Sequence, residues 1–389
     1  MSDSHSEYQY DYSTRGPYGA FRRGGNAIGT AILGFFVFIA SFGVLYWNEN
    51  QVDSTSIAKK AVIIDAAKEG PNSKFDGNLV MVSGKVVSNG ELGDEYLKPD
   101  NYLALLRKVE MYSWVETKST REYEEMDGTT VKKTTYSYNK QWKSTPESSS
   151  NFKDRYEHVN PSMTINNSEK KSQVVKIGEF TISPEQLAFP AYQKLNLSKD
   201  NIQLSNDILL ASDQYLFKGK GSLQSPQIGD VRISYLAVNS DFAGTALGLF
   251  NDGSIQAYND KRTNKNLARL FVGGRENALG KMQSEYEQRL WMFRGLGLFL
   301  MWIGICMFFE PLNVSLHILP VVGSFLSGIA ALVTGFISLI IAVILTAITL
   351  LVINIIKNIY VLIGVIILSF VLCLFVIKKV SHARKELPV

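Results

Sequence analysis

Apolar residues are concentrated in a few long runs, and the longest lies at the C-terminal end of the chain. Between residues 311 and 377 the only formally charged side chain is Lys357, and most others are Leu, Ile, Val, Phe, Ala, Gly, Ser or Thr. A helix needs about 20 apolar residues to cross a hydrocarbon core of about 30 Å, and in lipid its backbone groups must bond within the segment. The pattern therefore predicts membrane-spanning helices at this end.

Polar breaks divide the apolar residues into four predicted spans. The first ends in Tyr46-Trp47, an aromatic pair typical of a membrane interface, and no signal-peptidase site follows it, so we expect it to be retained. The second ends at Glu310-Pro311, where proline cannot continue a helix, and Lys357 marks the break before the last. In chain order, the spans are predicted at 27–47, at 291–309, within 319–353 and at 359–377.

The stretch 319–353 exceeds one span but falls short of two spans and a turn. We expect an interfacial or re-entrant helix around 321–331, followed by a tilted span near 332–353. Small residues four apart near its start allow helices to approach closely, so this part is predicted to pack against another helix. These residues are Gly323, Ser324, Ser327 and Gly328.

The polar ends of the chain set the expected topology. Residues 1–26 are polar and tyrosine-rich without an apolar period, which predicts a disordered tail. Its arginines precede the first span, and the basic tail 378–389 follows the last. The positive-inside rule places both tails in the cytosol, so residues 48–290 are expected to face the lumen or the periplasm.

Residues 48–290 have a water-soluble composition and are numerous enough to bury a core of their own. Ser183-Pro184 predicts a short helix through Phe189, and apolar residues at helical spacing predict a helix over 276–294 that continues into the second span. Period-two alternation predicts strands at 79–87, 103–118, 130–142, 173–182, 231–238, 245–250 and 267–272, with Gly253 turning the last pair. The predicted fold class is a membrane protein with an α-helical transmembrane region of four spans and a large β-rich (α+β) luminal or periplasmic domain.

The two longest predicted strands, 103–118 and 130–142, are expected to form one long antiparallel hairpin. Asp127-Gly128 between them is a favoured turn pair. The first strand sets Val109, Met111 and Val115 opposite Tyr112 and Trp114, and the second places on one face Thr134, Tyr136, Tyr138 and Trp142. Cross-strand aromatic pairs are therefore predicted to stabilise one face of the hairpin.

Charge and cysteine content narrow the possible functions. The formal net charge is only +4, so the chain lacks the global basic field that nucleic-acid binding needs. Its two cysteines, Cys306 and Cys373, fall in predicted spans, and its four histidines are scattered. We therefore expect no disulfide framework, no metal site and no cofactor.

The predicted hairpin and the segment after it also carry a dense motif. It begins with Val-Glu-Met-Tyr-Ser-Trp-Val-Glu-Thr at 109–117 and ends with Asn160-Pro161. This motif resembles the signature of the LUMA (transmembrane protein 43) family, and the layout of one N-terminal span, a large domain and three C-terminal hydrophobic segments is similar to that family. The motif residues are Val109, Glu110, Met111, Tyr112, Trp114, Glu116, Arg121, Glu122, Tyr123, Asp127, Gly128, Tyr136, Tyr138, Asn139, Trp142, Asn160 and Pro161.

The resemblance implies a protein of the endoplasmic reticulum and the inner nuclear membrane. It also implies a part in nuclear-envelope organisation, with lamins and emerin as partners. Related proteins occur in bacteria, which lack those partners; in a bacterium the location implied is the inner (plasma) membrane, with the domain in the periplasm.

The motif also invites a catalytic interpretation, which the pattern does not favour. Glu110, Glu116 and Glu122 offer carboxylates, and His158, the only histidine between 53 and 290, offers a base. Charges alternating with aromatic residues are, however, what a hairpin with one wet and one packed face requires. No nucleophile elbow or phosphate-loop spacing accompanies them, so no catalytic residue is assigned and the chain is not expected to be an enzyme.

The leading hypothesis is a non-enzymatic, self-associating multi-pass scaffold that contacts the lipid bilayer and no nucleic acid. It rests on the missing catalytic pattern, the small-residue helix positions and the family resemblance. Two alternatives stay open. One is a channel or transporter subunit, which the sequence disfavours because no ionisable residue except Lys357 lies deep enough to line a path; the other is a lipid-modifying membrane enzyme that uses Glu110 and His158.

Overall fold

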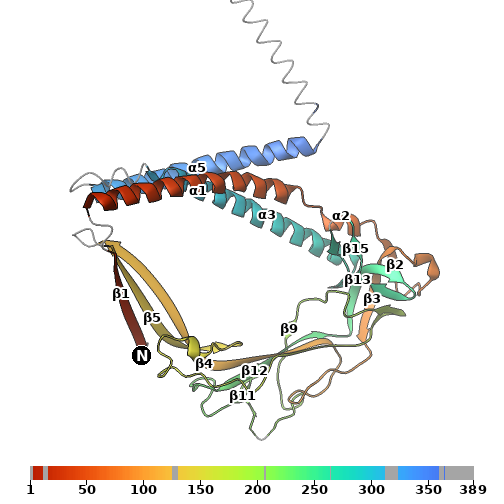
Figure 1. Cartoon of the computed structure of the whole chain (residues 1–389). Coiled ribbons are helices and arrows are strands. Elements are labelled where there is room, and N and C mark those ends of the chain that lie inside the picture. Colours follow the sequence, from red (N-terminus) through yellow and green to blue (C-terminus); the bar gives the residue numbers. More distant parts are fainter. Residues whose placement is uncertain are drawn as a thin grey trace, which may run out of the picture. The chain divides into compact units, whose positions relative to one another are not determined.

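The structure is a computed structural model that describes residues 3–11, 16–124, 130–205, 207–262, 264–311 and 323–358, together with Ile363. The chain divides into two compact units. The first unites Met1–Tyr12 with Val52–Glu285, and the second unites Ser13–Gln51 with Tyr286–Val389. Strands dominate the first unit and long helices the second (Figure 1). The water-soluble and the apolar parts of the sequence thus form separate units.

One antiparallel sheet of the first unit is built around a long hairpin. Its strands are β1 (Asp3–Asp11), β4 (Tyr102–Glu124), β5 (Thr130–Lys143), β6 (Ser168–Lys171), β9 (Gln193–Lys194), β10 (Leu209–Leu210), β11 (Leu216–Lys218) and β12 (Val231–Asn239). They run in the order β1-β5-β4-β12-β11-β10, while β6 pairs with β4 and β9 with β12. Figure 1 shows β1, β5 and β4 side by side. One face of this sheet packs on a hydrophobic core that includes Val109, Met111 and Ile233.

The second sheet closes on itself. Its strands are β2 (Val62–Asp65), β3 (Leu79–Ser88), β7 (Val175–Ile177), β8 (Phe180–Ile182), β13 (Phe242–Asn251), β14 (Ser254–Gln256) and β17 (Arg269–Val272). The order is β17-β13-β14-β8-β7-β3-β2, and β13 also pairs with β3. That last pairing joins β3, β13, β14, β8 and β7 into a ring, which leaves these strands without a free edge.

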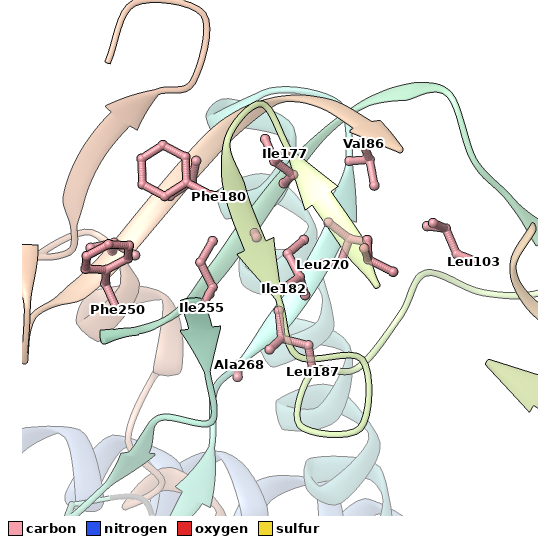
Figure 2. Close-up of a cluster of buried hydrophobic side chains, with 14 of the residues drawn as sticks. Val86, Leu103, Ile177, Phe180, Ile182, Leu187, Phe250, Ile255, Ala268 and Leu270 are labelled. Atoms are coloured by element: carbon pink, nitrogen blue, oxygen red, sulfur yellow. The ribbon is translucent and has the colours of Figure 1, made fainter. Parts of the chain in front are cut away.

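The ring surrounds a fully apolar core (Figure 2). Phe180, Ile182 and Phe250 are buried, and Figure 2 shows them in one cluster with Ile255 and Leu270. Inward residues alternate along each strand, as in the buried positions of Val175–Ile177 and Phe180–Ile182. Filling a small ring with branched and aromatic side chains is what makes it a packed core rather than a channel.

Short elements complete the first unit. They are the helix α2 (Ser54–Ala58), the 3-10 turns η2 (Ser73–Phe75) and η3 (Ser149–Asn151), and the strand pair β15 (Asn259–Asp260) and β16 (Lys265–Asn266). Asp53 caps α2 by accepting the backbone N–H of Thr55 at 2.8 Å.

The described residues of the second unit form three long helices: α1 (Gly16–Glu49), α3 (Arg275–Phe308), whose first residues belong to the first unit, and α5 (Gly323–Lys357). Leu45, Met301 and Ala342, one from each helix, are buried together. Among the described residues, three helical segments are long and apolar enough to cross a membrane: Ala27–Ala58, Arg275–Phe308 and Leu332–Lys357. Apolar side chains on their outer surfaces, such as Phe36 and Leu332, are exposed.

Several predicted elements are confirmed. The strands expected at 79–87, 103–118, 130–142, 231–238 and 245–250 correspond to β3, β4, β5, β12 and β13, and the strand expected at 267–272 is β17. The helix expected at 276–294 continues without a break as α3. The predicted turn at Asp127-Gly128 and the predicted fourth span at 359–377 lie outside the described residues, so the number of four spans is not confirmed.

Two predictions for the ends of the chain are wrong. Residues 3–11 were expected within a disordered tail, yet they form β1, because their backbone pairs with β5 and tyrosine is favoured in strands. The span expected near 332–353 lies within α5, but the separate helix expected around 321–331 is not found, because residues 323–357 form one continuous helix. No proline or charged residue interrupts the run, so its backbone bonds continue through the expected break.

Two local predictions within the domain are also wrong. The expected helix at Ser183–Phe189 is a turn, because Ala188 instead bonds through its N–H to Ala268 O and through its O to the N–H of Leu270. The expected strand at 173–182 is the tight hairpin β7–β8, in which Gly178 takes a left-handed φ of 58°. Likewise, Gly253 turns β13 into β14 rather than into β17.

Candidate functional site

The hairpin β4–β5 carries the motif on one face. Its register runs from Met111 opposite Lys143 to Glu124 opposite Thr130. Val109, Met111 and Val115 of β4 are buried, so the intervening positions point to the other side. That side, called the motif face here, consists of Glu110, Tyr112, Trp114 and Glu116 of β4 and Tyr138, Lys140 and Trp142 of β5. The predicted two-faced hairpin is therefore confirmed.

An imidazole ring lies at the centre of the motif face. His158 is only 2% exposed, and its ring stacks on Tyr138 with centroids 3.8 Å apart and planes at 10°. The Trp114 ring lies at 89° to the same ring, with centroids 4.6 Å apart. The Nδ1 of His158 lies 3.3 Å from the backbone oxygen of Asp154. His158 thus fills a pocket between two aromatic rings.

A phenol and a carboxylate fasten the following segment to this centre. The hydroxyl of Tyr138 donates to Glu116 Oε2 at 2.7 Å and accepts the backbone N–H of Asp154 at 2.8 Å. The same carboxylate oxygen accepts the backbone N–H of Lys153 at 2.6 Å. Burial, and then the hydrogen bond to the Glu116 carboxylate, raise the pKa of Tyr138 to about 12. The phenol therefore stays protonated and available as a donor at neutral pH.

Asn160 extends the sheet with its side chain. Its Oδ1 accepts the N–H of Trp114 at 2.7 Å, and its Nδ2 donates to Trp114 O at 2.9 Å and to Glu147 O at 3.0 Å. This amide thus satisfies both backbone groups of Trp114, beyond the point where pairing between β4 and β12 ends at Met111. A residue of the motif holds the loop to the strand where backbone pairing stops.

The other end of the motif face is charged and aromatic. Arg232 Nε donates to Glu110 Oε2 at 2.8 Å, and the guanidinium lies 4.7 Å from the Trp142 ring and 4.8 Å from the Tyr215 ring. Cross-strand aromatic pairing was predicted for this hairpin, and Tyr112 and Trp142 form such a pair, with ring centroids 5.3 Å apart. A small cavity of about 170 Å³ lies beside Glu110 and Arg232. The two charges are therefore paired with each other, and the guanidinium also lies over two aromatic rings.

The structure does not bring the remaining motif residues to this centre. Arg121, Glu122 and Tyr123 lie toward the far end of β4, where Glu122 pairs with Lys132 at 3.2 Å on the exposed surface. Asn139 is exposed on β5, and Pro161 lies against the turn at Gly229. Tyr136 continues the motif face toward Lys118, 5.8 Å from its ring. Gly323, Ser324, Ser327 and Gly328 belong to the first turns of α5, and their side chains are outside the described part of the chain.

Comparison with known proteins gives the family. The family model described as Transmembrane protein 43 matches residues 111–377, which is more than half of the chain and includes every residue of the motif face except Glu110. The chain belongs to this family. Transmembrane protein 43 of Homo sapiens is 32% identical over 219 residues, covering 53% of this chain and 52% of the human protein. The Mus musculus protein is 31% identical over 230 residues, covering 55% and 54%.

A relative from an insect extends the comparison. The Transmembrane protein 43 homolog of Drosophila melanogaster is 28% identical over 218 residues, covering 53% of this chain and 56% of that protein. The chain thus spans about half the length of the curated relatives it matches. No solved structure matches it. The similarity in sequence supports the Transmembrane protein 43 family and a membrane protein, as does the set of apolar helices.

The helices of this Transmembrane protein 43 family member have a second set of close contacts, which the sequence analysis missed. At Gly34 of α1, an added Cβ would lie 2.6 Å from Met307 Cβ and 2.8 Å from Gly304 O; at Gly304 of α3 it would lie 2.6 Å from Phe38 N. The two backbones are therefore in direct contact, which only glycine permits. The only sign of this contact in the sequence is that Gly34 and Gly304 each lie within an apolar run, and these two runs are far apart in the chain.

One ion pair joins the same two helices. Arg294 contacts the Glu49 carboxylate through Nε at 2.7 Å and Nη2 at 3.0 Å, and Glu49 is only 5% exposed. Next to it, Asn48 Nδ2 donates to Leu290 O at 3.1 Å, and the Trp47 ring meets the Phe293 ring at 5.2 Å. The charge on Arg294 is thus neutralised by Glu49 rather than left free beside the apolar helix.

Proposed function

We propose that this Transmembrane protein 43 family member is a non-enzymatic, multi-pass membrane scaffold that self-associates in the bilayer. The supporting observation is how the motif face uses its polar groups. Glu116 and Tyr138 accept backbone N–H groups of the segment that follows the hairpin, and Asn160 of that segment bonds back to Trp114 of β4. The motif thereby holds a rigid aromatic surface in place, and rigid surfaces suit assembly.

The arrangement gives less support to a lipid-modifying enzyme. A general base must lie within hydrogen-bond reach of the group it deprotonates, directly or through one water. His158 is buried between Tyr138 and Trp114, and Glu110 bonds to Arg232 near the other end of the motif face. The two groups considered for catalysis thus have separate partners inside the fold.

Self-association is proposed to use α5. Apolar side chains such as Leu332, Phe336 and Leu351 are exposed on this helix. In lipid such exposure has no solvation penalty, so contacts between helices depend on small residues that let backbones approach. The proposed contact is the turn that carries Gly323, Ser324, Ser327 and Gly328.

The compartment and partners are proposed from the family alone. In a eukaryotic cell we propose the endoplasmic reticulum and the inner nuclear membrane, with lamins and emerin as partners; in a bacterium we propose the inner membrane. Residues Val52–Glu285 are proposed to face the lumen or the periplasm, since that side receives long domains largely regardless of their charge.

The test is the mass of the full chain in mild detergent and in lipid nanodiscs. We expect an oligomer for the native sequence and a shift toward monomer for Gly328→Leu. Gly335→Leu is the matched control, because nothing lies within 4 Å of an added Cβ at that position. A strictly monomeric native protein in both environments would contradict the proposal. Lipid turnover abolished by His158→Ala, or liposome ion flux above background, would favour one of the two alternatives.

A further inference from the structure

The edge of β5 binds an extended segment with a defined chemistry. β1 pairs with it antiparallel, from Asp3 opposite Tyr138 to Asp11 opposite Thr130. Beside this ladder, Glu7 forms an ion pair with Lys153, the Lys133 ammonium lies 5.1 Å from the Tyr8 ring, and the Ser6 and Thr135 hydroxyls are 3.2 Å apart. The contacts with Tyr8 and Glu7 raise the pKa values of Lys133 and Lys153. An acidic, tyrosine-containing strand therefore fits this edge.

Chain connectivity makes this pairing incompatible with a membrane-spanning α1. The apolar run 27–47 lies between β1 and Val52, where the rest of the first unit begins. A helix that crosses a bilayer places the residues before it and after it on opposite sides. In one molecule, β1 can pair with β5 only while this run does not cross the membrane.

Membrane insertion of the apolar run 27–47 is favoured over the pairing of β1 with β5. Insertion of a helix as long and apolar as Ala27–Ala58 into a bilayer is effectively irreversible. A strand added at an edge contributes far less, since even an isolated two-stranded hairpin is marginal in water. Once the run crosses, β1 leaves β5 and exposes an edge strand of 14 residues. Long exposed edges are templates for pairing with another chain.

We propose that in the membrane-inserted protein the edge of β5 is a docking site for an extended acidic segment of another protein. The segment adds as an antiparallel strand on the side of the bilayer that holds Val52–Glu285. Its backbone supplies the ladder, a carboxylate reaches Lys153, and an aromatic ring lies under Lys133. This inference rests on the membrane-spanning arrangement proposed above and names the kind of partner that the scaffold receives.

The binding test uses a fluorescent synthetic peptide with the sequence of Asp3–Asp11. The receptor is the full chain with residues 3–11 replaced by a Gly-Ser linker, in nanodiscs of uncharged lipid. We expect saturable binding, roughly fivefold or more weaker for Lys153→Glu, and restored to that variant by a peptide with Glu7→Lys. Lys85→Glu is the matched control, since Lys85 lies on β3 and pairs with Asp241.

A second measurement separates this inference from the arrangement on which it rests. Ser6→Cys with Thr135→Cys places two thiols at directly paired positions, in a chain whose two native cysteines are alanine. In sealed membranes we expect no bond between them within one molecule. Absent cross-linking with saturable, charge-dependent peptide binding supports the inference.

Two results would overturn it in distinguishable ways. In the first, no cross-link forms and the peptide either does not bind, binds equally well to Lys153→Glu, or is displaced by anionic vesicles. Any of these outcomes overturns the docking site and leaves the scaffold proposal intact. Efficient cross-linking within one molecule in membranes shows that β1 occupies the edge there. It overturns both the docking site and the membrane-spanning α1, while the oligomer mass still tests self-association.

Discussion

The two units of this protein fix their geometry by different means. In the first unit, Tyr138, Glu116 and Asn160 form directed hydrogen bonds around the buried imidazole of His158. In the second, the backbones of Gly34 and Gly304 touch, and one ion pair stands among apolar side chains. Water drives apolar burial in the first unit, whereas lipid supplies no such drive between helices. The helices are therefore positioned by close backbone contacts and by the ion pair between Glu49 and Arg294. The hairpin and the segment after it are positioned by a network of hydrogen bonds.

The largest effect should come from removing the centre of the motif face. Tyr138 is 1% exposed, so Tyr138→Ala leaves a cavity against His158 and Phe152 and should lower the free energy of unfolding by about 3–5 kcal/mol. Denaturant unfolding followed by tryptophan fluorescence measures it. Tyr123→Ala, at an exposed position of β4, is the control and should change the free energy by about 0.5 kcal/mol or less.

The ion pair between helices should give the next largest effect. Glu49→Ala leaves Arg294 without its partner in a mostly buried site and should cost about 3 kcal/mol of stability. Replacing both residues, as in Glu49→Leu with Arg294→Met, should recover most of that loss, because no charge remains unpaired. Thermal unfolding in detergent, read by size-exclusion recovery, measures both. A double variant as unstable as the single one would show that the pair itself supplies the stability.

The glycine contact should give a smaller but position-specific effect. Gly304→Ala forces the backbones of α1 and α3 apart and should cost about 1–3 kcal/mol. Gly295→Ala, on the same helix with nothing within 4 Å of the added Cβ, should be neutral or slightly stabilising, since alanine favours helix. Equal effects of the two substitutions in the same thermal assay would mean that close approach does not position these helices.

An effect that is absent at neutral pH should appear in alkali, in the first unit. The pKa of Tyr138 is about 12, above its ordinary value of 10.0, so folding favours the protonated phenol. The stability this provides is present in full below pH 10 and is lost as the pH rises from about 10 to about 12. Tyr138→Phe should lose less stability across that window than the native chain. Unfolding curves at both pH values measure this, and identical losses would contradict the assigned cause.

The sequence predicted the parts of the fold that local pattern controls. The alternation around Met111 and Tyr112 predicted the two faces of the hairpin, and the helical spacing after Glu276 predicted a helix that enters the apolar region. It did not predict β1, whose strand depends on an edge more than 100 residues away. Nor did it predict the turn at Ala188, which pairing with β17 imposes.

The sequence identified several residues of the candidate site but not how they are arranged in space. Motif residues such as Trp114, Tyr138 and Asn160 do meet at the motif face, whereas Arg121 and Asn139 lie apart from it. The position of His158 between two rings depends on how the segment after β5 folds back, and periodicity contains no such information. The contact between Gly34 and Gly304 has the same origin, since each glycine looks ordinary in its own helix.

The ring of strands in the first unit has a consequence for biosynthesis. β3 and β13 pair with each other although residues 88 and 242 bound a long intervening chain, so the ring cannot close until β13 has left the ribosome. Pairings between segments so distant in sequence form slowly. A nascent chain halted before Phe242 would present β3 and β8 with unsatisfied edges, because their partners β13 and β14 follow that point, and chaperones would be its expected first contacts.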